Sequence, residues 1–377
     1  MEPLSIVDGL LIFEDRVQSG HVVISAGKIA EVGPEAKPRG IVLSATGLYV
    51  APGFIDLQVN GGGGHSFEDA DVKEIRKIAN FHLAHGTTGF LASLVSGPIS
   101  QLRRALGRLQ EAGHPAILGA HLEGPFISGN KRGAHNPDHI SAISLERFDA
   151  LVQGFAGFIK VVTFAPELPG ADLLIRRIRE MGAVPALGHT AATYAQAKAA
   201  LDQGVRLVTH LGNAMTPLGQ REPGVVGAGL DSDAYVSLIC DGVHVHPAFV
   251  RLVAKVKGFD RICLITDAIS AAGLPNGMYS LGSLPVEVQG GVARLPDGTL
   301  AGTTLTMDQA VRNFWRFTGC SLPEAVRCAT VNPARLLGIA DHKGSLEVGK
   351  DADLVVFDAD LRVHYTVLGG RIVARRD

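Results

Sequence analysis

The fold of this chain is decided by residues 186–215, which begin Ala-Leu-Gly-His-Thr (186–190) and end Val-Thr-His-Leu-Gly-Asn-Ala-Met (208–215). Two short apolar segments in this stretch each end in a histidine, His189 and His210, and a helix-length run separates them. In a (β/α)8 barrel enzyme the active-site residues lie at the carboxyl ends of the parallel strands. Strands that end in ionisable residues therefore predict this kind of barrel.

Two further apolar segments end in a carboxylate. Residues 116–123 end in Glu123, and residues 261–267 end in Asp267. Amphipathic, helix-like stretches separate most of the apolar segments, and a helix is the usual crossover between parallel strands. Eight segments are predicted as strands: residues 51–59, 87–95, 116–122, 158–164, 184–188, 205–210, 235–240 and 261–267.

Eight such units favour a closed (β/α)8 barrel of TIM type over an open, doubly wound sheet. An open nucleotide-binding sheet would carry Gly-x-Gly-x-x-Gly after its first strand, followed by a helix. The glycines at residues 61–64 are followed by His-Ser-Phe-Glu, which begins no clear helix. After the eighth strand, residues 277–302 are predicted to form an inserted hairpin.

Both ends of the chain differ from its middle. Residues 1–49 consist of short β-type runs with hairpin-like turns, and residues 343–377 show the same pattern with Gly and Asp turns. We therefore predict a small β-sandwich module built from residues 1–49 and 343–377. Residues 50–342 are predicted to form the barrel.

The composition limits the partners and the compartment. The charged residues make up 19% of the chain and nearly cancel to a formal net charge of −2, so no basic surface for nucleic acid is expected. No uninterrupted apolar run approaches the roughly 18 residues of a membrane span, and the N-terminus has no signal-peptide pattern. The four scattered cysteines indicate reduced thiols. These features predict a cytoplasmic protein that binds neither nucleic acid nor membrane.

Three strand-end residues form a candidate metal site. Glu123, His189 and His210 offer one carboxylate and two imidazoles, which leaves room for water on a divalent ion. Each residue also has a simpler interpretation, since a single buried histidine is usually a packed core residue and Glu123 before Gly-Pro could cap a loop. The coincidence of three at strand ends favours the metal.

The other candidates lie at the same predicted end of the barrel. Asp267 follows an apolar strand and could take a proton from water and return it to a leaving group, although it could also cap a helix. His135, Arg221 and His244 lie in loops after the third, sixth and seventh strands. Arginine pairs well with phosphate, which suggests an anion site, whereas solvated loop residues are the alternative.

Six short motifs occur along the chain: Pro-Gly-Phe-Ile-Asp-Leu-Gln-Val-Asn-Gly (52–61), His-Leu-Glu-Gly-Pro-Phe (121–126), Gly-His-Thr (188–190), Thr-His-Leu-Gly-Asn-Ala-Met (209–215), Asp-Gly-Val-His (241–244) and Thr-Asp-Ala (266–268). Together they resemble the N-acetylglucosamine-6-phosphate deacetylases of the amidohydrolase superfamily, and the resemblance spans the whole chain. The combination of His-Leu-Glu-Gly-Pro-Phe with His-Leu-x-Asn-Ala-Met is the most specific part, whereas the closing segment 344–354 is common to the superfamily. The resemblance therefore implies that residues 50–342 form a metal-dependent amidohydrolase barrel.

The resemblance implies a reaction and roles for its residues. The reaction is metal-dependent hydrolysis of the acetamide of N-acetyl-D-glucosamine 6-phosphate to D-glucosamine 6-phosphate and acetate, in amino-sugar catabolism or recycling. Glu123, His189 and His210 would bind the metal. Asp267 would act as general base and then as general acid, and His135 would bind the substrate and polarise its acetyl carbonyl.

The resemblance also implies a phosphosugar site. Asn213 and Ala214 would contact the sugar, and Arg221 and His244 would hold the 6-phosphate. In family members the 6-phosphate is bound partly by residues from across a subunit boundary. The resemblance therefore implies a homodimer or a higher oligomer with Arg221 and His244 near that boundary.

Two departures from the family pattern matter. Many amidohydrolases have His-x-His after the first strand for a second metal, whereas this chain has Gln58 and Asn60, and amides are poorer ligands for zinc-type ions. We therefore expect these positions to hold no metal and expect one divalent ion per subunit, with zinc as the first candidate and iron, manganese or cobalt as alternatives. Gly212 stands where the family often has an aromatic residue.

Three rival functions stay open at this stage. The first is deacetylation of another N-acetylhexosamine phosphate, such as the galacto epimer. The second is a different amidohydrolase reaction, such as deacylation of N-acyl amino acids, which the predicted phosphate-binding loops disfavour. The third is a non-catalytic scaffold, which usually lacks the ligands that this chain retains.

Overall fold

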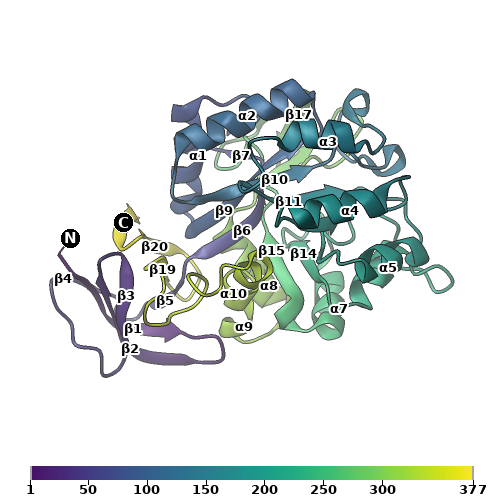
Figure 1. Cartoon of the computed structure of the whole chain (residues 1–377). Coiled ribbons are helices and arrows are strands. Elements are labelled where there is room, and N and C mark those ends of the chain that lie inside the picture. The colour runs from purple at the N-terminus through teal and green to yellow at the C-terminus, as the bar shows by residue number, and fades with distance from the viewer. Residues whose placement is uncertain (1, 376–377) are drawn as a thin grey trace.

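The computed structural model describes residues 2–375 and shows a barrel joined to a smaller chain-end sheet (Figure 1). Met1, Arg376 and Asp377, which the predicted chain-end module includes, lie outside the described residues. Both chain ends lie on the side of the smaller sheet (Figure 1).

Eight parallel strands form the barrel, and each hydrogen-bonds to the next around the sheet. The ring closes where Asp267 N donates to Gln58 O at 3.0 Å and Val59 bridges Ala268 in parallel. The predicted (β/α)8 barrel is thereby confirmed. The strands are β6 (Phe54–Val59), β9 (Thr87–Val95), β10 (Ile117–Glu123), β11 (Ile159–Phe164), β12 (Val184–Leu187), β13 (Leu207–Val208), β14 (Tyr235–Ile239) and β15 (Ile262–Ile265).

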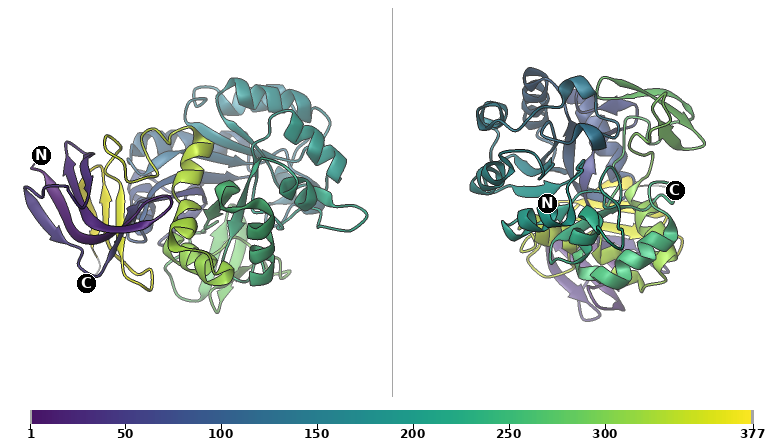
Figure 2. Two further views of the ribbon diagram at one scale, coloured as in Figure 1. Left: turned by 90° about the horizontal axis from the view of Figure 1, so that it is seen from below. Right: turned by 90° about the vertical axis from the view of Figure 1, so that its right-hand side faces the viewer.

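Helices surround the barrel and bury one apolar stripe each against the strands (Figures 1 and 2). Helix α1 is typical, because Asp71 accepts from Glu74 N at 2.8 Å to cap it, and its Ile75, Ile78 and Ala79 are buried. The helices are α1 (Val72–Leu83), α2 (Ile99–Ala112), α3 (Leu145–Val152), α4 (Ala171–Glu180), α5 (Tyr194–Asp202), α6 (Gly224–Leu230), α7 (Pro247–Lys257), α8 (Met307–Thr318), α9 (Leu322–Arg327) and α10 (Val331–Leu337). Short 3-10 turns occur at η1 (Gly129–Lys131), η2 (Pro137–His139) and η3 (Phe259–Arg261).

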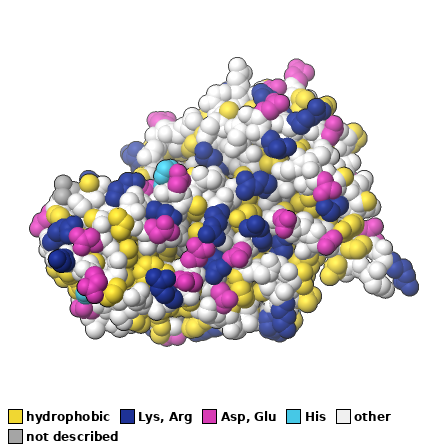
Figure 3. Space-filling view, turned by 60° about the horizontal axis from the view of Figure 1, so that its bottom comes forward, with side chains coloured by type: hydrophobic (Ala, Val, Ile, Leu, Met, Phe, Trp, Pro, Cys, Tyr) yellow, Lys and Arg dark blue, Asp and Glu magenta, His cyan; other side chains and the backbone are white. Residues whose placement is uncertain are grey.

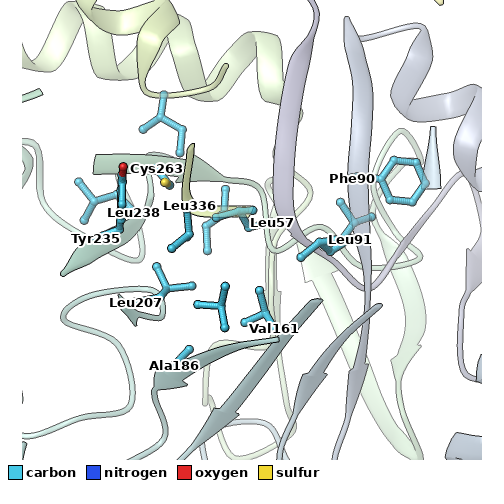
Figure 4. Close-up of a cluster of buried hydrophobic side chains, with 14 of the residues drawn as sticks. Leu57, Phe90, Leu91, Val161, Ala186, Leu207, Tyr235, Leu238, Cys263 and Leu336 are labelled. Atoms are coloured by element: carbon cyan, nitrogen blue, oxygen red, sulfur yellow. The ribbon is translucent and has the colours of Figure 1, made fainter. Parts of the chain in front are cut away.

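Apolar side chains from successive barrel strands form one buried cluster (Figure 4). Leu57 of β6, Leu91 of β9, Val161 of β11, Leu207 of β13 and Leu238 of β14 are each at most 1% exposed. Packing at this density leaves the strands little freedom to slide, so the residues at their carboxyl ends are held at fixed separations.

The two chain ends form a single connected eight-stranded sheet with its own apolar core (Figure 2). Antiparallel pairing of β5 with β19 joins the N-terminal part to the C-terminal part. The strands are β1 (Leu4–Ile12), β2 (Val17–Ser25), β3 (Lys28–Gly33), β4 (Ile41–Ser44), β5 (Tyr49–Pro52), β19 (Leu354–Phe357), β20 (Val363–Leu368) and β21 (Arg371–Arg375).

One predicted strand needs correction. Residues 51–59 form two strands, because β5 belongs to the chain-end sheet and β6 starts the barrel at Phe54. The chain turns between them at Gly53, whose N–H donates to Asp353 O at 2.9 Å. A β-carbon at Gly53 would lie 2.1 Å from Thr88 Oγ1, so this close approach requires glycine. The proposed boundary between residues 49 and 50 thus falls inside β5.

The predicted insertion after the eighth strand is a three-stranded antiparallel sheet, made of β16 (Gly277–Leu281), β17 (Leu284–Gln289) and β18 (Val292–Arg294). Leu281, Val286 and Ala293 are buried in a small core that also includes Val95 at the end of β9 and Ile269 after β15. A two-stranded ladder, β7 (Gly61–Gly62) with β8 (His65–Ser66), follows the first barrel strand.

The surface matches the balanced charge of the sequence. Lys and Arg side chains are interspersed with Asp and Glu side chains on the face shown in Figure 3. Among residues 2–375, no helix has the length and apolar character needed to cross a membrane.

Candidate active site and metal centre

The ionisable residues predicted from strand ends meet at the carboxyl end of the barrel. Glu123 is the last residue of β10, and His189, His210 and Asp267 each come two residues after their strand ends. They line one cavity of about 390 Å³. The other lining residues are Asn60, Val95, Asn130, Lys131, Gly133, Ala134, His135, Asn213, Ala214, Ile239, His244, Leu281, Arg294, Gly298, Thr299, Leu300 and Gly302.

The backbone is strained where these side chains are presented. His189, His210, Asp267 and Ala214 have φ of 49°, 35°, 51° and 48°, and they are four of the seven described non-glycine residues with positive φ. Such conformations cost on the order of 1–3 kcal/mol each and persist only where the surroundings enforce them. Here His210 N donates to Ser237 Oγ at 2.7 Å. The strain therefore marks a functional site rather than a loose loop.

Glu123, His189 and His210 bring three ligand atoms together. Glu123 Oε1 lies 3.2 Å from His189 Nε2 and 2.9 Å from His210 Nε2, and the two nitrogens are 3.1 Å apart. All three residues are buried. One carboxylate oxygen and two imidazole nitrogens converging on one point match the donor set of a divalent transition-metal ion.

The ring of His189 is held in the form that binds a metal. Its Nδ1 lies 3.0 Å from the carbonyl oxygen of Lys131, and a carbonyl can only accept. The proton of the neutral ring is therefore on Nδ1, and the lone pair of Nε2 is directed at the cluster. The residues present thus fit a divalent cation.

The charges of the cluster also favour a cation. Burial alone would raise the pKa of Glu123, but His189, His135 and His210 hold the pKa of this carboxyl well below its usual range. Burial opposes charge on His210 as well, yet the hydrogen bond to Glu123 raises the pKa of this imidazole, so a metal ion that binds here displaces a proton from His210. An ionised carboxylate is the form that binds metal ions.

Asp267 has the environment of a proton-transfer group. Burial, reinforced by the negative charge of Glu123, raises the pKa of Asp267 to about 6. Its Oδ1 accepts from Asn60 Nδ2 at 2.7 Å and from Gln58 Nε2 at 3.1 Å. A carboxyl group with a pKa near neutrality can both accept and return a proton.

His135 is placed as a neutral hydrogen-bond donor. Its Nδ1 accepts from Ser96 N at 3.2 Å, and a backbone N–H can only donate, so the proton of the neutral ring is on Nε2. Burial lowers the pKa of His135 to about 4, which keeps the ring neutral at pH 7. Nε2 lies 3.6 Å from Glu123 Oε2, and His135 lines the cavity, where its N–H can polarise a carbonyl.

The predicted substrate residues divide into two groups. Asn213, Ala214 and His244 line the cavity, and His244 Nδ1 lies 2.7 Å from Asp241 Oδ2. Arg221 is exposed and is not part of the cavity wall of its own chain. At Gly212, where the family pattern has an aromatic residue, a β-carbon would lie 3.2 Å from the ring of Phe249.

Sequence reasoning missed two contributors to the site. Ser96 follows β9, and only the folded structure shows its N–H on His135. Arg294 ends β18 and reaches the cavity wall, where Arg294 Nη1 donates to Gly298 O at 2.8 Å. The only available signal for Arg294 was that insertions at the carboxyl end of a barrel commonly shape the active site.

Comparisons with known proteins agree with this geometry. Residues 49–373 match the amidohydrolase family. The chain is 40% identical to the N-acetylglucosamine-6-phosphate deacetylase of Bos taurus, covering 97% of this chain and 92% of that protein. It is 38% identical to the N-acetylgalactosamine-6-phosphate deacetylase of Escherichia coli O157:H7, covering 97% of each. The structure of an Asp-to-Ala mutant of N-acetyl-D-glucosamine-6-phosphate deacetylase from Mycobacterium smegmatis, in complex with N-acetyl-D-glucosamine-6-phosphate, matches with a TM-score of 0.93 and 37% identity over 99% of both chains.

Proposed function

The chain belongs to the amidohydrolase family, and on that premise we propose that it hydrolyses the acetamide of N-acetyl-D-glucosamine 6-phosphate to D-glucosamine 6-phosphate and acetate. The observation that carries the proposal is the meeting of Glu123, His189, His210, Asp267 and His135 around one cavity. The same substrate is bound in the matching structure from Mycobacterium smegmatis. A non-catalytic scaffold has no use for these five ionisable groups, four of them buried and three of them on a strained backbone.

Two side chains, Asp267 and His135, carry out the proton transfers and stabilise the negative charge that develops during the reaction. A divalent cation on Glu123, His189 and His210 would supply Lewis-acid polarisation and make water a better nucleophile at neutral pH. Asp267 accepts the proton as water attacks the acetyl carbon. His135 donates its Nε2–H to the oxygen on which negative charge develops. Asp267 then protonates the nitrogen as the C–N bond breaks, so acetate and the free amine leave with all atoms accounted for.

We expect one metal ion per subunit, and zinc is the first candidate among zinc, iron, manganese and cobalt. Two imidazoles and one carboxylate form the usual donor set of a catalytic zinc site with an open position. The positions of a second metal carry amide side chains, Gln58 and Asn60, and both turn N–H donors toward the carboxylates.

We place the enzyme in the cytoplasm. Cys240, Cys263, Cys320 and Cys328 are all free thiols, as is usual for proteins of a reducing compartment. Cell fractionation against a cytosolic marker enzyme tests this placement, and recovery with a secreted fraction would overturn it.

The proposal extends to a homodimer in which Arg221 of each subunit completes the phosphate site of the other. Arg221 is exposed and lies outside the cavity of its own chain, whereas His244 lines it. Arginine binds phosphate through two parallel hydrogen bonds. We expect Arg221→Ala to raise KM for the phosphorylated sugar by about 10- to 100-fold, the loss of one charge-assisted contact, and to leave the fold intact.

A mixing experiment tests whether Arg221 acts across the boundary. Heterodimers are prepared from one Arg221→Ala subunit and one Asp267→Asn subunit. If Arg221 acts on the neighbouring site, one of the two sites contains both native residues, and about half of the wild-type activity returns. If Arg221 acts within its own chain, neither site is complete, and the heterodimer stays as impaired as its parents.

The proposed function is tested by acetate release from metal-stripped and zinc-restored protein. The substrates are N-acetylglucosamine 6-phosphate, its galacto epimer and unphosphorylated N-acetylglucosamine. Zinc-dependent release with the highest kcat/KM for the gluco phosphate supports the proposal. The galacto epimer is included because one relative is named for it. A higher kcat/KM for that epimer would reassign the substrate, and release from none of the three with any divalent ion would overturn the function.

A further inference from the structure

Two buried amide side chains surround the carboxylate of Asp267. Gln58 and Asn60 lie on and just after β6, and each is 1% exposed. Asn60 Nδ2 donates to Asp267 Oδ1 at 2.7 Å, and Gln58 Nε2 donates to the same oxygen at 3.1 Å. Both donors reach one oxygen, and no described donor is hydrogen-bonded to Asp267 Oδ2.

The orientation of these amides is set by the carboxylates. Gln58 Oε1 and Asn60 Oδ1 are buried and have no hydrogen-bond partner among residues 2–375. Leaving a buried carbonyl oxygen without a hydrogen bond costs free energy. Rotating the amide groups to exchange their oxygen and nitrogen atoms must therefore cost more free energy. The turned amides would place carbonyl oxygens within about 3 Å of carboxylate oxygens, where only repulsion is available.

Gln58 is tied to Asp267 and to the metal site at once. Its backbone carbonyl accepts from Asp267 N at 3.0 Å, and its Nε2 also donates to Glu123 Oε1 at 3.0 Å. A shift of Asp267 relative to Glu123 would therefore break several hydrogen bonds together. This fixes the separation between the proton-transfer carboxylate and the metal-binding carboxylate.

We propose that Gln58 and Asn60 are positioning residues, a two-donor clamp that holds Oδ1 of Asp267 and leaves Oδ2 to exchange the proton. This proposal rests on the proposed function, in which Asp267 is base and then acid. The clamp occupies the positions that would hold a second metal and supplies two N–H donors in place of a second cation. A base held at the correct angle throughout both proton transfers needs no reorganisation between them.

The rival interpretation is that the amides only fill space in the barrel. Asn332 provides the matched control, because it is 0% exposed and donates to Phe259 O at 2.6 Å and Ile262 O at 2.7 Å. Ile262 begins β15, whereas Asp267 follows the end of the same strand. If these amides have only a structural role, substituting Asn60 beside one end of β15 and Asn332 beside the other should have the same effects on kcat and Tm.

The test compares zinc-loaded Asn60→Ala, Asn60→Asp and Asn332→Ala with the wild type, using N-acetylglucosamine 6-phosphate. We expect Asn60→Ala to lower kcat by on the order of 10- to 100-fold with KM within about threefold, because the base is misplaced while the substrate contacts remain. Zinc content should stay at one per subunit, and the visible spectrum of the cobalt-substituted protein should be unchanged. Asn332→Ala should lower Tm and leave kcat within about twofold.

Asn60→Asp keeps the shape of the side chain, so it tests the donor even if Asn60→Ala fails to fold. It places a second carboxylate against Oδ1 of Asp267, and the acid limb of the pH–kcat profile should move to higher pH because like charges raise each other's pKa. The proposal is overturned if both Asn60 variants keep kcat within twofold, if they lose zinc together with activity, or if Asn332→Ala loses kcat equally. A wild-type protein inactive on the substrate would instead overturn the proposed function.

Discussion

The zinc-loaded Asp267→Asn variant is expected to lose about 10²- to 10⁴-fold in kcat, the contribution of a positioned general acid–base group. The loss should lie toward the upper end, because Asp267 serves both proton transfers. The amide oxygen of Asn can still accept from Gln58 and Asn60, whose donors lie 3.1 Å and 2.7 Å from Oδ1, so the local structure is retained. Steady-state kinetics with N-acetylglucosamine 6-phosphate measure the effect.

Metal analysis of the same variant provides the control, with one ion per subunit expected. In the metal-free state its Tm should be at or above that of the metal-free wild type, since a buried carboxylate whose pKa is raised to about 6 opposes folding while it is ionised at higher pH. A kcat within tenfold of the wild type would contradict the assigned role. So would a loss of activity fully explained by a loss of metal.

The same carboxylate gives the wild-type activity a predictable pH dependence. The base works only when ionised, and burial raises the pKa of Asp267 to about 6, so kcat/KM should fall as pH is lowered through the pKa. A bound divalent cation adds positive charge nearby and lowers that pKa, which places the acid limb at or below this value. The limb should disappear from the residual activity of Asp267→Asn.

The sequence was sufficient for the architecture because the barrel repeats one simple signal. Apolar runs that alternate with amphipathic helices bury themselves as a parallel sheet covered by helices, and eight such runs favour the closed barrel over an open sheet. The strand that was wrong in detail, residues 51–59, contains Pro52-Gly53, a local break signal that lies at the junction of β5 and β6. Which sheet each half joins depends on the pairing of β5 with β19 and of β6 with β9, and these tertiary contacts have no local signature in the sequence.

The candidate site likewise contains residues that the sequence predicts and contacts that only the folded structure reveals. Glu123, His189, His210 and Asp267 could be predicted, because a charged or ligating residue at the end of an apolar strand has few structural uses. The hydrogen bond from Ser96 to His135 could not be predicted, because it is a backbone donor that any residue could supply. The amide orientations in the Gln58–Asn60 clamp could not be predicted either, because they depend on the carboxylates of Glu123 and Asp267, which lie more than 60 and 200 positions away in the sequence.

Removal of the metal is the second perturbation with a large expected effect. A chelator should abolish acetate release, and zinc should restore it, since in the stripped protein His135 and Asp267 act on the substrate and water without the Lewis acid that would lower the pKa of the attacking water. Loading should also raise Tm, because a ligand present at 100 times its Kd stabilises the folded state by about 2.7 kcal/mol. Calorimetry of stripped and loaded protein, beside the assay, measures both effects.

Two histidine variants locate the effect at the predicted ligands. His210→Ala removes an atom of the cluster and should lower zinc content well below one per subunit, with activity at background. His121→Gln is the matched control: His121 is as deeply buried and lies on the same strand as Glu123, but its Nδ1 lies 3.0 Å from Leu57 O and its Nε2 2.7 Å from Thr163 Oγ1. Both of its nitrogens are used within the protein, so His121 has no lone pair to offer a metal, and its substitution should reduce stability while zinc stays bound. Equal zinc loss in the two variants would show that general disruption of the barrel, rather than ligation, explains the metal dependence.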